Sequence, residues 1–102
     1  MTRITEENIN SIISGEKQAW KVTSYGAYVI FKCIMETEKD NYLACDVRNF
    51  NTFLISKETL LNYSYIFDTM KDVYQKQIEW HENQIKFIKN QIFSLENPDS
   101  IL

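Results

Sequence analysis

One histidine and two cysteines are the side chains of this chain best suited to catalysis or metal binding: His81, Cys33 and Cys45. A closed zinc site is four-coordinate, so these three residues, with the histidine remote from the cysteines, are too few to hold the ion. The 102 residues contain no glycine-rich phosphate loop, no Cys-x-x-Cys pair and no His-Glu-x-x-His helix. We therefore expect a protein that is not an enzyme and that holds no metal and no cofactor.

Each of these side chains also has a structural interpretation. Cys33 and Cys45 face one another in the strand pairing predicted below, which suits either a cross-strand disulfide or two small apolar core residues. The second interpretation is favoured, because the N-terminus has no signal-peptide pattern and thiols stay reduced inside cells. His81 lies on the apolar side of a predicted helix, where packing at a helix interface is favoured over a ligand or a pH sensor.

Composition and charge favour one small globular unit that binds proteins. The chain is 44% hydrophobic, with only two glycines and one proline, so it can bury a core. Its formal net charge of −3 argues against gripping a nucleic acid by charge alone. Aromatic residues that could stack on bases are surrounded by acidic ones, so direct RNA binding is not expected. No apolar run is long enough to span a membrane.

Hydrophobic periodicity and turn residues predict an α+β fold with a five-stranded, strongly bent antiparallel sheet. A short N-terminal helix is predicted over residues 5–14, from a Thr5 N-cap to a stop at Gly15. The strands are predicted at Ala19–Ser24, Ala27–Glu36, Tyr42–Arg48, Thr52–Ser56 and Asn62–Phe67. The last one is ambiguous, since residues 57–67 also suit a helix, but the β-propensity of its aromatic residues favours a strand.

The pairing of the first three strands follows from two predicted turns, at Tyr25-Gly26 and around Lys39. Both turns lead to the same result, in which the apolar residues share one face of the sheet and a slip by one residue would scatter them. The pairs on that face are Val22–Val29, Trp20–Phe31, Met35–Leu43 and Cys33–Cys45.

The strongest helical pattern covers residues 69–95, which Asp68 is expected to cap and no Gly or Pro interrupts. An apolar stripe recurs along it at alternating spacings of four and three residues: Tyr74, Ile78, His81, Ile85, Ile88, Ile92 and Leu95. Such a helix is ~40 Å long, whereas a compact domain of this size has a radius of gyration of about 13 Å. Part of the helix is therefore expected to project and to expose an interaction surface.

The middle of the chain, from about Ser11 to Phe67, resembles the Sm/LSm family. Gly26 leads into a long second strand, and Glu36 and Asn41 follow near the positions of that family's acidic residue and asparagine. In the segment Ile55-Ser56-Lys57-Glu58-Thr59-Leu60-Leu61-Asn62-Tyr63, the apolar positions match the second Sm motif at Ile55, Leu60 and Tyr63. The Arg-Gly of that motif is replaced by Ser56-Lys57, which is similar to degenerate members that do not bind RNA.

Among degenerate members, the chain resembles the Gemin subunits of the SMN complex, and the Gemin-six type in particular. The similarity lies in Trp20-Lys21-Val22-Thr23-Ser24 and in Tyr28, Phe31 and Asn41. It implies an Sm-like domain over residues 1–68, a docking helix over 69–96 and a tail over 97–102. It also implies a non-catalytic scaffold, cytoplasmic and nuclear, that assists spliceosomal snRNP assembly through protein contacts.

Two partner-binding surfaces follow from this resemblance and from the pattern of the last helix. The fourth strand of one Sm protein pairs with the fifth of the next, and unprotected sheet edges accept added strands. A Gemin-seven-type partner is therefore expected at Phe53, Ile55, Tyr63 and Tyr65. A helical partner of the Gemin-eight type is expected at Ile78, His81, Ile85, Ile88 and Ile92. The alternative is a homodimeric α+β inhibitor or regulator, of phage or mobile-element type, that dimerises through an antiparallel coiled coil of the last helix.

Overall fold

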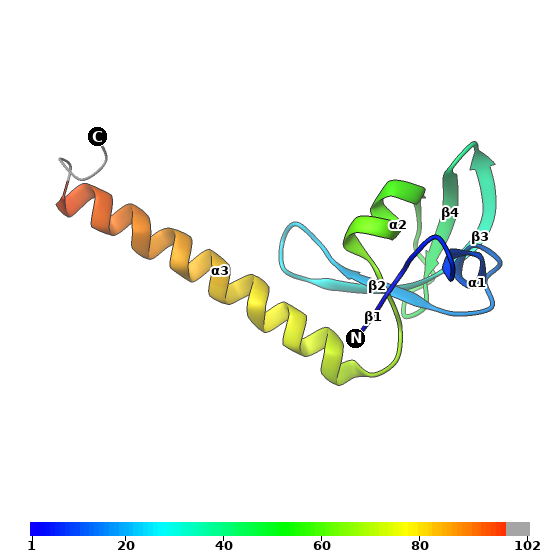
Figure 1. The fold of residues 1–102 in the computed structure, drawn as a ribbon, viewed down its shortest axis with the longest axis horizontal. Coiled ribbons are helices and arrows are strands. Elements are labelled where there is room, and N and C mark those ends of the chain that lie inside the picture. The colour runs from blue at the N-terminus through cyan, green and yellow to red at the C-terminus, as the bar shows by residue number, and fades with distance from the viewer. Residues whose placement is uncertain (98–102) are drawn as a thin grey trace.

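The computed structural model describes residues 1–97, which form a six-stranded antiparallel sheet and three helices (Figure 1). The elements in chain order are β1 (Thr2–Arg3), α1 (Ile9–Ile13), β2 (Ala19–Val22), β3 (Tyr28–Glu38), β4 (Asn41–Asp46), β5 (Thr52–Ser56), α2 (Lys57–Tyr63), β6 (Tyr65–Ile66) and α3 (Met70–Glu96). The strand order in the sheet is β1-β6-β2-β3-β4-β5, so β1 and β5 form its edges. The fold is α+β with a long C-terminal helix, as predicted, but the sheet has one strand more than the five expected.

The hairpin of β2 and β3 places Trp20 and Phe31 on opposite faces of the sheet. Its strands are joined by residues 23–27, where Gly26 has a φ of +81° that favours glycine. Trp20 pairs with Ile30, so the predicted pairing of Trp20 with Phe31 is wrong by one residue. The register differs because the loop is longer than the two-residue turn expected. A slip of one residue moves each side chain of a strand to the other face of the sheet.

The hairpin of β3 and β4 follows the prediction only near its turn. Met35 lies opposite Leu43, as expected. An irregularity between Cys33 and Met35 then shifts the register, and Cys33 faces Ala44 instead of Cys45. Such a register shift is typical of a β-bulge, in which one strand contains an extra, unpaired residue. The predicted pairing of the two cysteines is therefore wrong, and both are free thiols.

Residues 57–67 form a helix and a very short strand, where a strand over Asn62–Phe67 was predicted. The helix, α2, begins after Ser56, whose hydroxyl accepts a hydrogen bond from the Thr59 amide at 3.1 Å. It buries Leu60 completely. The strand that follows, β6, lies between β1 and β2. The predicted fifth strand is therefore neither six residues long nor an edge of the sheet.

The N-terminal segment supplies a strand as well as a helix. In β1, Arg3 lies opposite Tyr65 of β6, so the two ends of the sheet-forming segment meet. The helix α1 covers five residues and not the ten predicted over 5–14. Its expected first turn is a separate local structure, in which the Asn8 side chain accepts a hydrogen bond from the Thr5 amide at 2.8 Å. Thr5 is therefore not the N-cap of α1.

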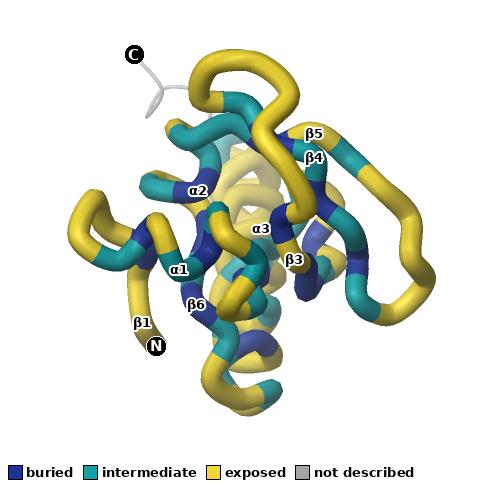
Figure 2. Tube along the Cα trace, turned by 90° about the vertical axis from the view of Figure 1, so that its right-hand side faces the viewer, coloured by how far each residue is buried: buried dark blue, intermediate teal, exposed yellow. Residues whose placement is uncertain are grey.

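Buried side chains lie on both faces of the sheet. The larger cluster packs beneath α1 and α2 and comprises Ile4, Ile9, Ile12, Ala19, Phe31, Cys33, Tyr42, Ala44, Ile55, Leu60 and Ile66. The smaller cluster is on the opposite face and joins Trp20 and Ile30 to Val73 of α3. Figure 2 shows that buried segments, in dark blue, gather in the globular part, whereas most of α3 is exposed. The helices α1 and α2 therefore cover one face of the sheet. The first turns of α3 pack against the other face.

The helix α3 leaves the globular part and extends away from it (Figure 1). Its bounds lie within one residue of the predicted range 69–95. Thr69, and not Asp68, caps it by accepting a hydrogen bond from the Asp72 amide at 3.4 Å. The molecule measures 54 × 29 × 27 Å, and its radius of gyration of 17.2 Å exceeds the value of about 13 Å for a compact chain of this length. The predicted projection of this helix is confirmed.

The division predicted at residue 68 falls one residue before the N-cap of α3. The first turns of the helix nevertheless belong to the core of the sheet, through Val73. The predicted tail, residues 97–102, lies outside the described residues except for Asn97.

Candidate protein-binding interface

One stripe of α3 attaches the helix to the sheet. Val73 is fully buried against the sheet, and Met70 packs at the rim of the same cluster. Further along, the Gln77 side-chain amide donates a hydrogen bond to the Gly26 carbonyl at 3.0 Å. The Trp80 ring closes this contact, since a Cβ at Gly26 would come within 2.6 Å of it. The attachment therefore ends near Trp80. Beyond the β2–β3 loop, α3 extends away from the globular part (Figure 1).

A second stripe of α3 is largely exposed, although at its base the Tyr74 ring meets the Tyr28 ring edge to face at 6.0 Å. We call it the heptad face, and it comprises Tyr74, Ile78, His81, Ile85, Ile88, Ile92 and Leu95. The four isoleucines keep exposures of 50–56%, which is high for side chains of this type. Every residue from His81 to Phe93 is exposed. The structure therefore brings all five predicted helix-site residues, Ile78, His81, Ile85, Ile88 and Ile92, onto one accessible surface.

His81 lies at the junction between the two stripes. Its ring meets the Trp80 ring edge to face, with the centroids 4.9 Å apart. The residue is exposed, so its predicted packing at a helix interface stays a prediction about contact with a partner. Its ring also lies close to the β2–β3 loop, since its Cε1 atom would be 3.0 Å from a Cβ at Gly26.

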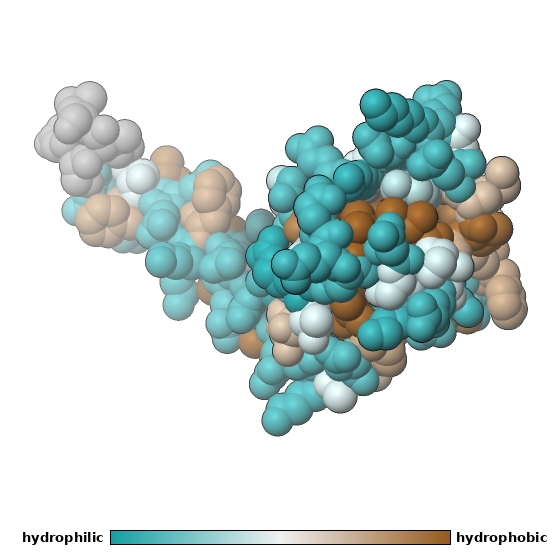
Figure 3. All heavy atoms as spheres, turned by 45° about the vertical axis from the view of Figure 1, so that its right-hand side comes forward, coloured by the Kyte–Doolittle hydropathy of each residue, from teal (hydrophilic) through white to brown (hydrophobic). Residues whose placement is uncertain are grey.

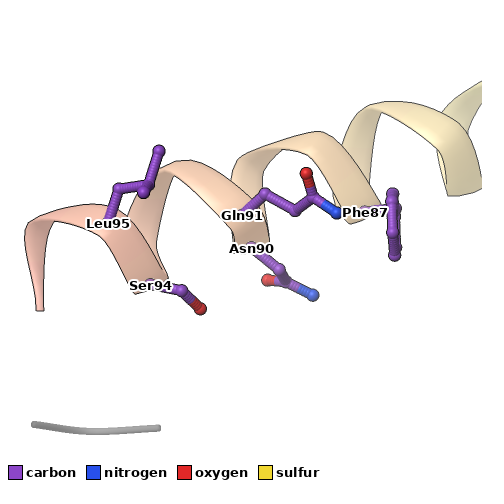
Figure 4. Close-up of a pocket in the computed structure, with 5 residues that line it drawn as sticks. All are labelled: Phe87, Asn90, Gln91, Ser94 and Leu95. Carbon is purple, nitrogen blue, oxygen red and sulfur yellow. The ribbon is translucent and has the colours of Figure 1, made fainter. Parts of the chain in front are cut away.

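An open hollow of about 570 Å³ lies along the last turns of α3 (Figure 4). Phe87 and Leu95 give it apolar walls, and Asn90, Gln91 and Ser94 line the rest. Phe87 is 59% exposed and was not among the predicted site residues. All the described residues that line this hollow belong to α3.

The residues predicted for the sheet-edge contact occupy four different environments. Ile55 is in the core, at 4% exposure, and Phe53 meets the Phe31 ring at 5.4 Å. Tyr63 is exposed at the end of α2 and is not in a strand. Tyr65 is in β6 and stacks on Trp20 at 4.8 Å. Of the two strands predicted as edges, only β5 is one, because β1 covers β6.

A row of apolar side chains crosses the sheet toward the β5 edge. Met35, Leu43 and Leu54 lie opposite one another in β3, β4 and β5. Met35 is 55% exposed and Leu54 is 69% exposed. Figure 3 shows hydrophobic residues, in brown, reaching the surface of the globular part as well as that of the projecting helix. Leu54 was not among the predicted site residues, because a turn at the predicted residues 49–51 would set it opposite Asp46 and not opposite Leu43.

The two cysteines differ in accessibility. Cys33 is buried, and burial raises the pKa of its thiol from the ordinary value of 9.0 to about 11. Cys45 is half-buried. The structure thus supports the interpretation of Cys33 as a small core residue.

Thiol labelling at pH 8 should therefore modify Cys45 first. A pKa of about 11 leaves Cys33 with about a hundredfold less thiolate than a thiol of pKa 9.0, and its burial adds a steric barrier. Mass spectrometry after brief treatment with a maleimide should show one adduct per folded chain. Cys45→Ser should remove this fast adduct, and rapid double labelling of the native chain would contradict the burial of Cys33.

Two of the basic residues, Arg48 and Lys57, are paired within the chain. The Arg48 guanidinium lies 4.3 Å from the centre of the Tyr28 ring, donates to the Tyr28 carbonyl at 2.9 Å and is 3.5 Å from the Asp46 carboxylate. Lys57 is paired with Glu6 at 3.2 Å. These cations are engaged within the chain, which removes two of the charges that a phosphate groove would need.

Comparisons with family models, with curated proteins and with solved structures find no match to this chain. Among residues 1–97, no cluster of His, Cys, Asp or Glu side chains is placed to hold a metal ion. No helix in the same range is both long enough and apolar enough to cross a membrane.

Proposed function

We propose that this chain is a non-catalytic assembly subunit that works by binding other proteins through the heptad face of α3. The observation that carries the proposal is the exposure of an apolar stripe on a helix that has left its own domain. Soluble proteins rarely expose apolar surface of this extent unless a partner covers it. A helix of this length without tertiary cover is also only marginally stable in water.

Burial of the heptad face would offset much of the free-energy cost of association. The five aliphatic side chains of the heptad face, Ile78, Ile85, Ile88, Ile92 and Leu95, are at least half exposed. Full burial would add about 1 kcal/mol for each, and a matching stripe on the partner would double the gain. The total of about 10 kcal/mol falls within the range of 4–15 kcal/mol that association costs. A partner with an apolar stripe of its own therefore suits this face best, with further contacts supplying the net affinity.

A more specific form of the proposal is the Sm-like scaffold of the SMN complex that the resemblance to Gemin subunits suggests. The free edge of β5 and the exposed Leu54 support a partner of the Gemin-seven type that adds a strand there. In this arrangement Phe53 and Ile55 belong to the contacting strand, whereas Tyr63 and Tyr65 do not. A helical subunit of the Gemin-eight type would cover α3.

The second candidate is a homodimeric regulator in which another copy of the chain covers α3. The regular alternation of four and three residues along the heptad face favours it, because this repeat is typical of a two-helix seam.

Site-specific photo-cross-linking in the source cells tests the proposal. A photo-reactive amino acid in place of Ile85 should form a protein adduct, since that side chain is at the centre of the heptad face. The matched control is Asn83, which is exposed on the opposite side of the same helix and should give none. A third position, Leu54, reports on the β5 edge. Absence of an adduct at Ile85, or equal adducts at Ile85 and Asn83, would contradict the proposed function.

A further inference from the structure

We infer that the heptad face pairs with the heptad face of a second copy of this chain, antiparallel, with Ile85 of each helix against Ile88 of the other. The inference rests on the proposed function of α3 and names the occupant of the face.

The repeat of the exposed stripe is that of a supercoiled helix pair. With Ile78, Ile85 and Ile92 at the first core position, His81, Ile88 and Leu95 fall at the fourth position of each heptad. A repeat of 3.5 residues keeps such a stripe facing one partner helix over its whole length. The stripe that attaches α3 to the sheet lies at other heptad positions, through Val73 and Trp80. Pairing through the heptad face therefore leaves the attachment to the sheet intact.

The charges beside the core select the antiparallel register. When Ile85 faces Ile88 of the second copy, Glu82 of each chain comes beside Lys89 of the other, which gives two opposite-charge contacts. A shift of one heptad in one direction brings Glu82 of one chain beside Glu82 of the other. A shift in the other direction brings Lys89 of one chain beside Lys89 of the other. Both shifted registers place like charges together, so the register centred on Ile85 and Ile88 is the complementary one.

A parallel pair lacks this complementarity. It would set Glu82 beside Gln77 and Lys89 beside Gln84, with no opposite-charge contact across the seam. It would also stack His81 on His81 of the second copy in one core layer. In the antiparallel pair, His81 faces Ile92 instead.

The antiparallel pair also suits the shape of the molecule. The paired segment, residues 78–95, extends over ~26 Å, and only its first turn overlaps the contacts that Trp80 and His81 make with the β2–β3 loop. The two globular parts then lie at opposite ends of the seam. Each sheet stays clear of the other, and the β5 edges remain free for a different partner.

Light scattering with a charge-reversal cycle tests both the stoichiometry and the orientation. The purified wild-type chain should have twice the monomer mass of 12.1 kDa and should dissociate on dilution. Glu82→Lys should weaken the dimer about tenfold, because it places two lysines together in both charge contacts of the seam. Adding Lys89→Glu should restore it by re-forming both pairs with reversed signs. A chain that is monomeric throughout, or a dimer in which the second change gives no rescue, would overturn the inference.

Disulfide trapping gives an independent measure of the orientation, in a Cys45→Ser background. Ile78→Cys chains mixed with Leu95→Cys chains should cross-link to each other, since these positions face across the antiparallel seam. Ile78→Cys alone should not cross-link, because its two copies would lie ~26 Å apart. The opposite pattern would show a parallel pair. If the chain is monomeric but the photo-adduct at Ile85 contains a different protein, this inference fails and the proposed function stands.

Discussion

A chain with Ile85→Asp and Ile88→Asp should lose its partner entirely while its sheet stays folded. Both isoleucines are more than half exposed and neither contacts the core, so the domain has little to lose. In an assembled state they occupy the centre of the seam, where two carboxylates would have to be desolvated without a cation opposite. Each charge costs several kcal/mol there, which exceeds the margin of a contact of this size.

The control for this variant adds the same charge to the other side of the helix. Asn83→Asp and Asn90→Asp are also exposed and should leave assembly unchanged. Sedimentation velocity measures the mass of the assembly, and circular dichroism measures the melting temperature of the domain. Equal assembly of the two double variants would show that the heptad face is not the contact.

Trp20→Ala should cost about 3–5 kcal/mol of the free energy of unfolding and should detach the base of α3. Trp20 is fully buried, stacks on Tyr65 at 4.8 Å and belongs to the cluster that includes Val73 of α3. Among the described residues, this cluster is the fully buried contact between the sheet and α3. Loss of the Trp20 ring opens a cavity in it. The net stability of a domain of this size is about 5–15 kcal/mol, so this loss is a large fraction of it.

Trp20→Phe is the matched control for that substitution. Among residues 1–97, no hydrogen-bond acceptor reaches the buried Nε1 of Trp20, so its removal leaves no partner unsatisfied. The phenyl ring keeps most of the apolar contact, and we expect less than half of the alanine effect. Urea denaturation followed by circular dichroism at 222 nm measures both values. A loss below about 1 kcal/mol in Trp20→Ala would contradict the role of the second cluster.

The long helix is predictable from sequence because its signals are local. No glycine or proline interrupts residues 70–96, and the apolar spacing is helical throughout. Even its start is wrong by only one residue, since both Asp68 and Thr69 are good caps and the Thr69 hydroxyl makes the bond. Exposure of the heptad face also follows from sequence, because a helix this long outreaches the sheet.

The register of the sheet could not be predicted, because it depends on two local irregularities. The loop around Gly26 and the bulge after Cys33 each change the pairing by one residue. Nothing in the alternation of hydrophobic residues records an extra residue. One consequence is that Trp20 and Phe31 support different faces, and so the burial of the sheet under α3 was not foreseen.

The predicted edge site failed where long-range contacts decided the structure. The aromatic residues after Asn62 have β-propensity, yet Ser56 caps a helix, and Leu60 anchors it in the core. The strand β1 then covers β6 from the far end of the chain. The β-propensity of a short segment carries no information on such a long-range contact. Of the two strands predicted as edges, only β5 is one.

Hydrogen exchange of the backbone amides in residues 82–96 tests most directly whether this half of α3 binds protein. The measurement compares the natively purified assembly with the Ile85→Asp and Ile88→Asp chain. Uncovered, this segment is a helical extension of about four turns that frays readily. We expect slow exchange in the assembly and fast exchange in the variant, with no change in the amides of β3 and β4. Equally fast exchange in both would contradict the assignment of the heptad face of α3 as a protein interface.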